Sequence, residues 1–474
     1  MSQHASPATA TDTGEPTRVR FGVLAFACSL SMITYLDRVC FGSAAPQLAT
    51  ELGYASVADL GLAFTAFAFA YAAFEVPTGW LGDVFGPRNT LIRIVIWWSL
   101  FTAITGFVGM KIGSITLGGL GVLIAVRFLF GIGEAGAYPN ITRALHNWFP
   151  FTERGFTQGM VWMSGRLMGG LTPLIWALLV TAKEGESPLL TWRQAFWLFG
   201  GLGLIWCVLF ALWFRNRPEE KSTVNDAELA LINKGQEAHA DHSHVPWGKI
   251  LSSGNLWILC AMYFCSAYGW YFNITYLPAF LEEQFHVEKS SVIGAIYKGG
   301  PLWLGAVGCL AGGVFTDWFI RRTGDRRLGR RLLGIVGHAL CAICYFSSIY
   351  APTAFTFFLA ISLAAFCNDL TMGSAWATCQ DIGRKYAAIA AGCMNTIGNL
   401  GGAVAGTLTG YILNQAKDGY AEKLGVAVET LTKSQIAEAQ LPGYHINFVS
   451  YAVVYCIAIG CWFLIDATKP IAEE

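Results

Sequence analysis

The sequence predicts an all-α membrane protein in which twelve transmembrane helices form two pseudo-symmetric six-helix bundles. Hydrophobic residues make up 54% of its 474 residues and charged residues only 13%, about half of the roughly 25% that is usual in soluble domains. Apolar stretches long enough to cross a bilayer recur along the chain, and motifs of its first half return in its second half. Composition and repetition together indicate this fold class.

The apolar stretches give the predicted spans. A helix that crosses the hydrocarbon core needs about 20 mostly apolar residues. Gly or Pro within such a helix is tolerated because neighbouring helices satisfy the freed backbone groups. The predicted spans are residues 20–45, 59–81, 90–110, 116–138, 157–181, 194–214, 255–280, 292–317, 332–350, 353–378, 386–414 and 447–467.

The distribution of Lys and Arg predicts the orientation. Of the 31 Lys and Arg residues, 20 lie on one side of the predicted spans, 8 lie on the other side, and Arg38, Arg127 and Arg166 lie within spans. Cytoplasmic loops carry the excess of positive charge, and the richer side holds both termini. We therefore expect a multi-pass protein of the cell (inner) membrane with a disordered cytoplasmic tail at 1–19 and a second cytoplasmic tail at 468–474.

A polar stretch at residues 215–254 divides the chain, and we expect it to be a cytoplasmic linker between bundles at 20–214 and 255–467. "GWLGD" at 79–83 returns as "GVFTD" at 313–317, and "QGMVWMSGRLMGG" from Gln158 aligns with "AGCMNTIGNLGG" from Ala391. Parallel repeats of six spans are the construction of one large class of transporters.

Glycines recur at every fourth residue along the eleventh predicted span, at Gly398, Gly402, Gly406 and Gly410. Such a face of small residues lets two helices approach closely. Static packing and a moving gate would both use it. The matched glycines in the fifth span favour the gate.

Charges inside the predicted spans are the candidate functional residues. An ionisable residue in the hydrocarbon costs roughly 2.5–3.5 kcal/mol on insertion scales, so it normally faces a cavity or a partner. These residues are Asp37, Arg38, Glu75, Arg127, Glu134, Arg166 and Asp369.

Four of these charges, from the first and fourth spans, are expected to converge near the middle of the membrane. We call Asp37, Arg38, Arg127 and Glu134 the charged cluster. Arg38 and Arg127 are permanently charged forks suited to a carboxylate, whereas Asp37 and Glu134 can take up and release protons as the site opens to each side. The alternative is two static ion pairs, Asp37 with Arg127 and Glu134 with Arg38, that only hold two spans together.

The other three charges leave alternatives open. Glu75 is either a second titratable site or a structural partner of Arg93. Arg166 adds a cation that favours a dianionic substrate, or else it balances Glu75. Asp369 is a candidate partner of Arg166 across the two bundles. The uncharged candidates for substrate contact are Tyr71, Tyr271, Trp376, Asn395 and Asn399. Simple packing is the alternative for the aromatic residues, whereas buried amides need partners.

The loop after the second span predicts a gate on the cytoplasmic side. Gly79 lets the second span pack closely, and Asp83 can cap a neighbouring helix end or pair with Arg88 or Arg93. Asp317 is the counterpart of Asp83 in the second half. We expect these residues to hold one surface closed in one state.

Several motifs of the sequence resemble those of a known family of transporters. "GWLGDVFGPR" (79–88) resembles the signature loop of the major facilitator superfamily. Its anion:cation symporter family is similar at "YLDR" (35–38), "FAYAAFEVPTGWLGD" (69–83), "RFLFGIGEAGAYPN" (127–140) and "NTIGNLGG" (395–402). That family includes bacterial galactonate, hexuronate and glucarate transporters and vesicular sialic acid carriers.

The resemblance covers residues 21–466 and implies the twelve-helix fold of the superfamily. It also implies that Asp37 and Glu134 couple transport to protons and that Arg38 contacts the anion. Two positions depart from the family pattern. Members more often carry an amide at the position of Glu75, and some carry Gln at that of Arg166.

We predict a secondary transporter that moves an organic anion with protons by alternating access. The expected substrates are sugar acids, such as an aldonate, a hexuronate or an aldarate, or another carboxylate. The alternatives are sodium as the coupling ion, a uniporter or exporter of another small solute, and a non-transporting membrane sensor.

Other classes of function are not expected. The chain has no nucleophile triad, P-loop or dinucleotide fingerprint on a strand–helix unit, so we expect neither an enzyme nor a cofactor or metal site. Its formal net charge is zero, and nothing suggests a nucleic-acid partner. The expected partners are the organic anion, the coupling ion and the bilayer. Because one chain contains both bundles, we expect it to function as a monomer.

Overall fold

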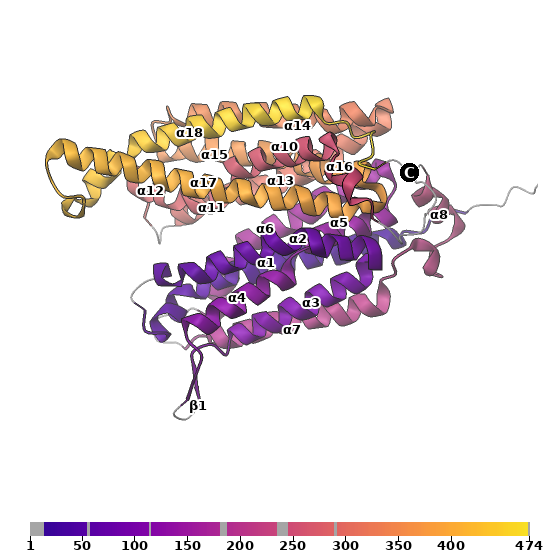
Figure 1. Cartoon of the computed structure of the whole chain (residues 1–474), viewed down its shortest axis with the longest axis horizontal. Coiled ribbons are helices and arrows are strands. Elements are labelled where there is room, and N and C mark those ends of the chain that lie inside the picture. The colour runs from indigo at the N-terminus through magenta and orange to yellow at the C-terminus, as the bar shows by residue number, and fades with distance from the viewer. Residues whose placement is uncertain are drawn as a thin grey trace, which may run out of the picture.

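The computed structural model describes residues 14–54, 57–112, 115–180, 187–234, 245–288 and 292–472. Residues 1–13 and 473–474 of the predicted tails, and 235–244 of the predicted linker, lie outside these ranges. Two bundles of long helices lie side by side in Figure 1, the N-half (residues 19–213) in indigo to magenta and the C-half (residues 254–464) in red to yellow.

The N-half contains seven α-helices because one predicted span is divided. They are α1 (Val19–Glu51), α2 (Gly61–Phe85), α3 (Pro87–Thr105), α4 (Leu120–Glu134), α5 (Ala137–Trp148), α6 (Arg154–Val180) and α7 (Trp192–Trp213). Two short strands, β1 (Met110–Ile112) and β2 (Ile115–Leu117), pair antiparallel between α3 and α4.

The C-half follows the same plan with two divided spans. Its helices are α10 (Gly254–Trp270), α11 (Phe272–Thr275), α12 (Leu277–Phe285), α13 (Val292–Thr323), α14 (Arg326–Ser348), α15 (Ala354–Asp369), α16 (Met372–Gly383), α17 (Ala387–Leu424) and α18 (Lys433–Leu464). The linker between the halves carries α8 (Asp226–Asn233) and α9 (Trp247–Leu251).

The helices agree with the predicted twelve spans. Within the described ranges, nine helical segments are long and apolar enough to cross a membrane. One of them, Ala354–Leu424, comprises two crossings that turn at the short helix Arg384–Tyr386. The other two crossings are formed by α3 and by α10–α12. They are not among the nine segments because these helices are shorter or less apolar than the others.

Both described ends of the chain lie at the same end of the molecule. The Thr17 hydroxyl donates to Glu228 of α8 at 2.6 Å, and the backbone N–H of Ile471 donates to the carbonyl of Ile382 at 2.9 Å. We call this end, which carries α8 and the C-terminus in Figure 1, the linker end. The opposite end carries the strands β1 and β2, and we call it the hairpin end.

Two corresponding helices of the two halves break directly after an acidic residue. The helix α4 ends at Glu134, and α5 starts after Gly136, whose φ of +81° is a left-handed conformation that suits glycine. In the C-half, α15 ends at Asp369 and α16 begins at Met372. Interrupted helices of this kind form the substrate sites of many transporters, because the irregular backbone faces a cavity.

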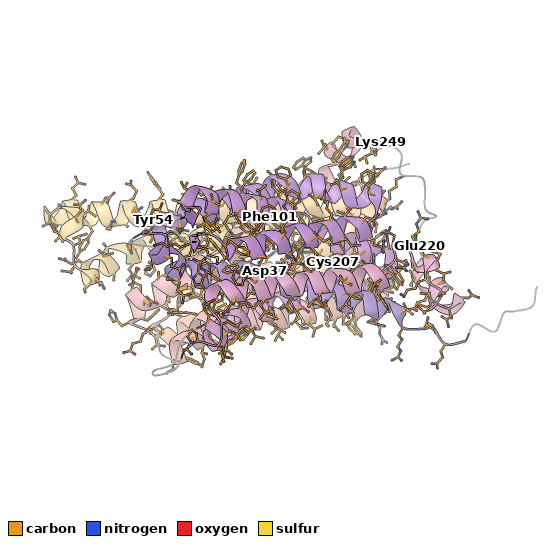
Figure 2. All side chains as sticks on the ribbon, turned by 90° about the horizontal axis from the view of Figure 1, so that it is seen from below. Asp37, Tyr54, Phe101, Cys207, Glu220 and Lys249 are labelled. Atoms are coloured by element: carbon orange, nitrogen blue, oxygen red, sulfur yellow. The ribbon has the colours of Figure 1, made fainter. Side chains whose placement is uncertain are left out.

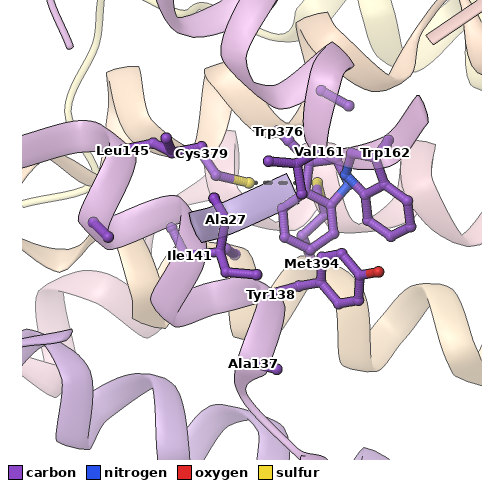
Figure 3. Packing of buried hydrophobic residues seen from close by; sticks show 14 of the residues in the cluster. Ala27, Ala137, Tyr138, Ile141, Leu145, Val161, Trp162, Trp376, Cys379 and Met394 are labelled. Carbon is purple, nitrogen blue, oxygen red and sulfur yellow. Dashed lines mark hydrogen bonds between the residues drawn. The ribbon is translucent and has the colours of Figure 1, made fainter. Parts of the chain in front are cut away.

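An aromatic core lies between the two halves. Figure 3 shows Tyr138 of α5, Trp162 of α6 and Trp376 of α16 packed together. The rings of Tyr138 and Trp162 stack at 4.5 Å, and Trp376 lies 5.1 Å from Trp162. Because Trp376 belongs to the other half, this core joins the two halves.

Some helix boundaries differ from the prediction. The fourth predicted span ended at residue 138, yet α5 continues to Trp148 because its polar side chains are buried against neighbouring helices rather than exposed to lipid. The amide of Asn140, for example, donates to the Thr78 carbonyl at 3.2 Å. At the hairpin end, α17 and α18 extend beyond the predicted spans through polar residues and project past the rest of the bundle in Figure 1.

Candidate functional site

A cavity of about 550 Å³, including its mouth, lies between the halves. Helices of both halves line it. The predicted substrate contacts that line it are Arg38, Tyr71, Arg166, Tyr271, Asn395 and Asn399.

The first charged residues at the cavity are Arg38 of α1 and Glu134 of α4. Arg38 donates from Nε to Glu134 Oε1 at 2.6 Å, and its guanidinium lies 4.4 Å from the ring centre of Tyr71. The Arg38 side chain is 27% exposed, whereas that of Glu134 is 1% exposed. Arg38 therefore faces the cavity with Glu134 behind it.

The other two members of the charged cluster lie deeper. Figure 2 shows Asp37 within the bundle, between Tyr54 toward the hairpin end and Glu220 toward the linker end. Asp37 accepts a hydrogen bond from Thr102 at 3.3 Å. Arg127 has no ion pair in the described chain and does not line the cavity. It lies instead in an aromatic cage formed by the rings of Phe41, Phe67 and Phe130, at 4.1 to 4.9 Å.

This geometry decides between the two interpretations of the cluster only in part. The static pair of Arg38 with Glu134 is present, whereas the second one, Asp37 with Arg127, is not formed within 4 Å. Among the buried polar atoms of the described chain that have no hydrogen-bond partner, five lie on these residues and on Glu75: Asp37 Oδ1, Arg38 Nη2, Glu75 Oε2, Arg127 Nε and Glu134 Oε2. Such atoms are few in native proteins and cost about 1–3 kcal/mol each. In the charged cluster, the unpaired atoms lie on both acids and on both arginines, and this leaves acceptors and donors for a proton and an anion.

Glu75 joins the halves. Asn395 of α17 donates to Glu75 Oε1 and, at 3.3 Å, to the hydroxyl of Tyr71. Asn399, one turn further along, donates to the Asn395 carbonyl and accepts from Tyr271 at 3.4 Å. Glu75 is fully buried and lies behind the cavity wall.

The expected alternative that Glu75 contacts Arg93 is wrong. Arg93 is exposed on α3, whereas Glu75 turns toward α17 in the other half.

Arg166 and Asp369 form the predicted pair across the halves. Arg166 donates from Nε and Nη2 to the two oxygens of Asp369 at 2.9 and 3.3 Å, and from Nη1 to the Tyr35 hydroxyl at 2.8 Å. Its guanidinium also lies 3.9 Å from the ring centre of Trp270. The alternative that Arg166 balances Glu75 is wrong, because its hydrogen bonds go to Asp369 and Tyr35.

Trp376 does not line the cavity, contrary to expectation. It is fully buried, donates to the Tyr263 hydroxyl at 3.2 Å and packs in the core between the halves. Four aromatic residues that were not predicted do line the cavity: Tyr35, Tyr138, Trp162 and Trp270. Helical spacing could have identified two of them, because Tyr35 and Trp162 lie three and four residues before Arg38 and Arg166, on the same helical faces.

The repeat has a direct structural counterpart. A Cβ on Gly165 of α6 would lie 2.6 Å from the ring of Tyr35, and one on Gly398 of α17 would lie 2.4 Å from the ring of Tyr263. The corresponding helices α6 and α17 thus each approach the first helix of their own half through a glycine. Gly406 has no such neighbour within 4 Å, so only part of the glycine face is used for packing.

Asp83 caps a helix of the opposite half at the linker end. Its carboxylate accepts the backbone N–H groups of Ala388 and Ile389, at the start of α17, at 3.1 and 2.8 Å. We call this contact the first clasp. A Cβ on the neighbouring Gly79 would lie 2.7 Å from the Ala388 carbonyl oxygen, so close approach requires glycine there.

Asp317 forms the corresponding second clasp. It accepts the backbone N–H groups of Gly155 and Phe156, at the start of α6, at 3.1 and 2.6 Å. Arg330 joins it at 3.0 Å.

The expected pairing of Asp83 with Arg88 or Arg93 is not formed. Arg88 instead donates to the carbonyls of Ala211 and Phe214 at the end of α7, and Arg93 is exposed. The guanidinium nearest to Asp83 belongs to Arg143, at 3.5 Å.

Comparison with curated proteins finds related transporters. A probable sulfoacetate transporter, SauU, of Cupriavidus necator is 34% identical over 402 residues, which cover 84% of this chain and 88% of that protein. A probable galactarate/D-glucarate transporter, GudP, of Escherichia coli is 28% identical, with 84% and 88% covered. The hexuronate transporter of Bacillus subtilis is also 28% identical, with 83% and 88% covered.

Solved structures share the fold at low sequence identity. The proton:xylose symporter XylE superposes with a TM-score of 0.69 at 13% identity, covering 95% of this chain and 97% of that one. FucP in its outward conformation superposes with a TM-score of 0.66, also at 13% identity, with 95% and 100% covered. The profile of the Major Facilitator Superfamily matches residues 27–406. The chain therefore belongs to the major facilitator superfamily, and it is a membrane transporter rather than an enzyme.

Proposed function

We propose that this protein is a proton-coupled symporter of a small organic anion. The observation that carries the proposal is the set of unpaired buried atoms in the charged cluster, on Asp37, Arg38, Arg127 and Glu134. Relatives named as carriers of sulfoacetate, galactarate or glucarate, and hexuronate support the substrate class. All of these compounds carry a carboxylate or a sulfonate, which the Arg38 fork can bind.

In the proposed mechanism, the substrate anion and the Glu134 carboxylate compete for Arg38. Glu134 holds Arg38 while the carboxylate is ionised. When Glu134 takes up a proton, Arg38 is free to bind the anion. Asp37 lies next to Arg38 in the chain and has one unpaired oxygen, so it is the second proton acceptor. A neutralised cluster costs less to enclose in a low-dielectric interior, which permits the halves to rock.

The two clasps support an assignment of the conformation. With the linker end closed by Asp83 and Asp317, the cavity is reached from the hairpin end. We propose that the linker end, with both termini, is cytoplasmic and that the protein lies in the inner membrane. The structure then corresponds to a state in which the cavity faces outward.

The test is uptake of labelled sulfoacetate, galactarate and a hexuronate into proteoliposomes, with and without an inward proton gradient and with and without sodium. Asp37→Asn and Glu134→Gln should lose accumulation but retain exchange. Asp418→Asn and Glu422→Gln are the matched controls, because both residues are exposed on α17 at the hairpin end. Equilibration that ignores the gradient in wild type and in both cluster variants would identify a uniporter. Accumulation that follows sodium alone would replace the proton as coupling ion.

A further inference from the structure

We propose that the cavity binds a dianion, with one acidic group on Arg38 and the other on Arg166, and that the second group displaces Asp369 from Arg166. This inference rests on the proposed function, because it concerns the same cavity. It names the substrate class as small molecules with two acidic groups, and it gives Asp369 a role in the transport cycle.

The first support is the correspondence between Glu134 and Asp369. Each is the last residue of a helix that breaks at this point, α4 in the N-half and α15 in the C-half. Each binds the guanidinium of an arginine that lines the cavity. The cavity therefore carries the same arrangement of arginine, carboxylate and helix break twice, which is what a substrate with two similar ends requires.

The second support is the closeness of the two arginines. The Tyr35 hydroxyl accepts from Arg166 at 2.8 Å, and Tyr35 precedes Arg38 by one helical turn on α1. Residues three apart on a helix have Cβ atoms about 5–6 Å apart. Arg38 and Arg166 thus flank one tyrosine in the lining of the same cavity.

The surroundings of Arg166 prepare it for a second anion. Trp270 covers one face of the guanidinium at 3.9 Å and Trp162 lies at 5.6 Å. These rings fix the plane of the fork and exclude water, which strengthens its attraction for an anion. Asp369 uses two of the five N–H groups and Tyr35 a third. A substrate group that binds the edge formed by Nε and Nη2 must therefore take over the positions that Asp369 holds.

Asp369 retains a polar neighbour when it is displaced. The amide of Asn368, which itself lines the cavity, donates to Asp369 Oδ1 at 3.1 Å. The displacement also has a mechanical consequence. Arg38 and Glu134 belong to the same half, whereas Arg166 and Asp369 join opposite halves. Only the second acidic group therefore releases a bond between the halves, which couples a dianion, but not a monoanion, to their movement.

The test compares probes that differ by one charge on the same skeleton. Galactarate is paired with galactonate, and sulfoacetate with its amide. Binding to purified protein is measured by calorimetry, and transport is measured in proteoliposomes. We expect wild type to prefer the dianion of at least one pair by tenfold or more. Arg166→Gln should reduce that preference to threefold or less, while Arg38→Gln should weaken binding of both members of the pair.

A charge exchange separates a substrate role from a structural one. Arg166→Asp combined with Asp369→Arg restores the ion pair and, with it, thermal stability, but it moves the fork to the other half and should not restore the dianion preference. Arg166→Gln combined with Asp369→Asn leaves no unpaired buried charge and provides a folded variant if Arg166→Gln alone does not fold.

Several outcomes would overturn the inference. The first is that wild type binds both members of each pair equally, or binds neither. The second is that Arg166→Gln keeps the preference for the dianion. The third is that the charge exchange restores this preference. Failure of the proposed function is distinct. Wild-type protein could ignore the proton gradient and still bind the dianion tenfold more tightly, because the binding measurement involves no gradient.

Discussion

Asp83 and Asp317 hold equivalent positions in the two halves, and each caps a helix of the opposite half. Asp83 receives two backbone N–H groups from the start of α17, and Asp317 receives two from the start of α6. A carboxylate at a helix N-terminus is stabilised by the unpaired N–H groups and by the helix dipole. The linker end is therefore closed by two equivalent contacts. In one, a carboxylate of the N-half caps a helix of the C-half, and in the other, a carboxylate of the C-half caps a helix of the N-half.

Asp83→Asn should open the linker end without unfolding the protein. Asn keeps one acceptor oxygen but turns an amide toward the second N–H group, and a hydrogen bond to a charged group is worth about 1.5–3 kcal/mol. The closed state should lose roughly ten- to hundredfold in population relative to the open one. Fluorophores at the exposed Asn89 and Arg322, both at the linker end, should report a longer distance. An unchanged distance distribution would show that the first clasp does not hold the closed state.

Asp317→Asn should lower thermal stability more than Asp83→Asn does. Asp317 belongs to a buried network in which Arg330 contacts both Asp317 and Asp381, and Arg154 contacts Asp381 at 2.8 Å. Removal of Asp317 leaves the buried guanidinium groups of Arg330 and Arg154 to share Asp381, and an uncompensated buried charge typically costs about 3–5 kcal/mol. Asp83, in contrast, loses only a longer contact with Arg143, at 3.5 Å. Thermal unfolding in detergent measures the difference. The double variant Asp317→Asn with Arg330→Gln should recover part of the loss, and equal melting temperatures for the two single variants would contradict the expectation.

If Glu75 is a further titratable site beside Asp37 and Glu134, Glu75→Gln should reduce the number of protons carried with each substrate by one. Gln can still accept the hydrogen bond from Asn395, so the contact between the halves persists, but it cannot take up a proton. Reversal potentials in proteoliposomes give the ratio of protons to substrate. Glu422→Gln, an exposed substitution, is the control. An unchanged ratio with reduced uptake would instead assign Glu75 a purely structural role between the halves.

Gly159→Ala should favour the state in which the linker end is open. A Cβ at Gly159 would lie 2.4 Å from the carbonyl oxygen of Cys309 in the other half, and overpacking typically costs about 1–3 kcal/mol. The cost falls on the closed state because this contact joins α6 to α13. The distance between fluorophores at Asn89 and Arg322 measures the opening of the linker end in this variant as well, and it should increase.

Gly201→Ala on α7 is the matched control for this glycine, because no atom lies within 4 Å of its added Cβ. It should leave the distance unchanged, and its better helix propensity contributes up to about 1 kcal/mol of stability. If the distance in Gly159→Ala equals that in the control, the linker end has stayed closed. The α6–α13 contact would then tolerate the extra methyl group.

Much of the site was predictable because its chemistry is unusual for its surroundings. Charges in an apolar helix are costly, so Arg38, Glu134 and Arg166 stood out without any knowledge of their partners. Trp376 shows the limit of that reasoning. A tryptophan in an apolar helix is equally favourable in a core or at a cavity wall, and the structure places it in the core.

The sequence by itself determined the twelve crossings and the repeat of the two halves, because hydrophobic length and helical period are properties of consecutive residues. The tertiary structure decided which charges meet. Glu134 binds Arg38, Asp369 binds Arg166, and Asp83 binds a helix end instead of Arg88. These choices depend on which helices cross and on how glycines such as Gly79 and Gly165 bring them together. A contact between two helices that are distant in the chain leaves no periodic pattern in the sequence of either helix.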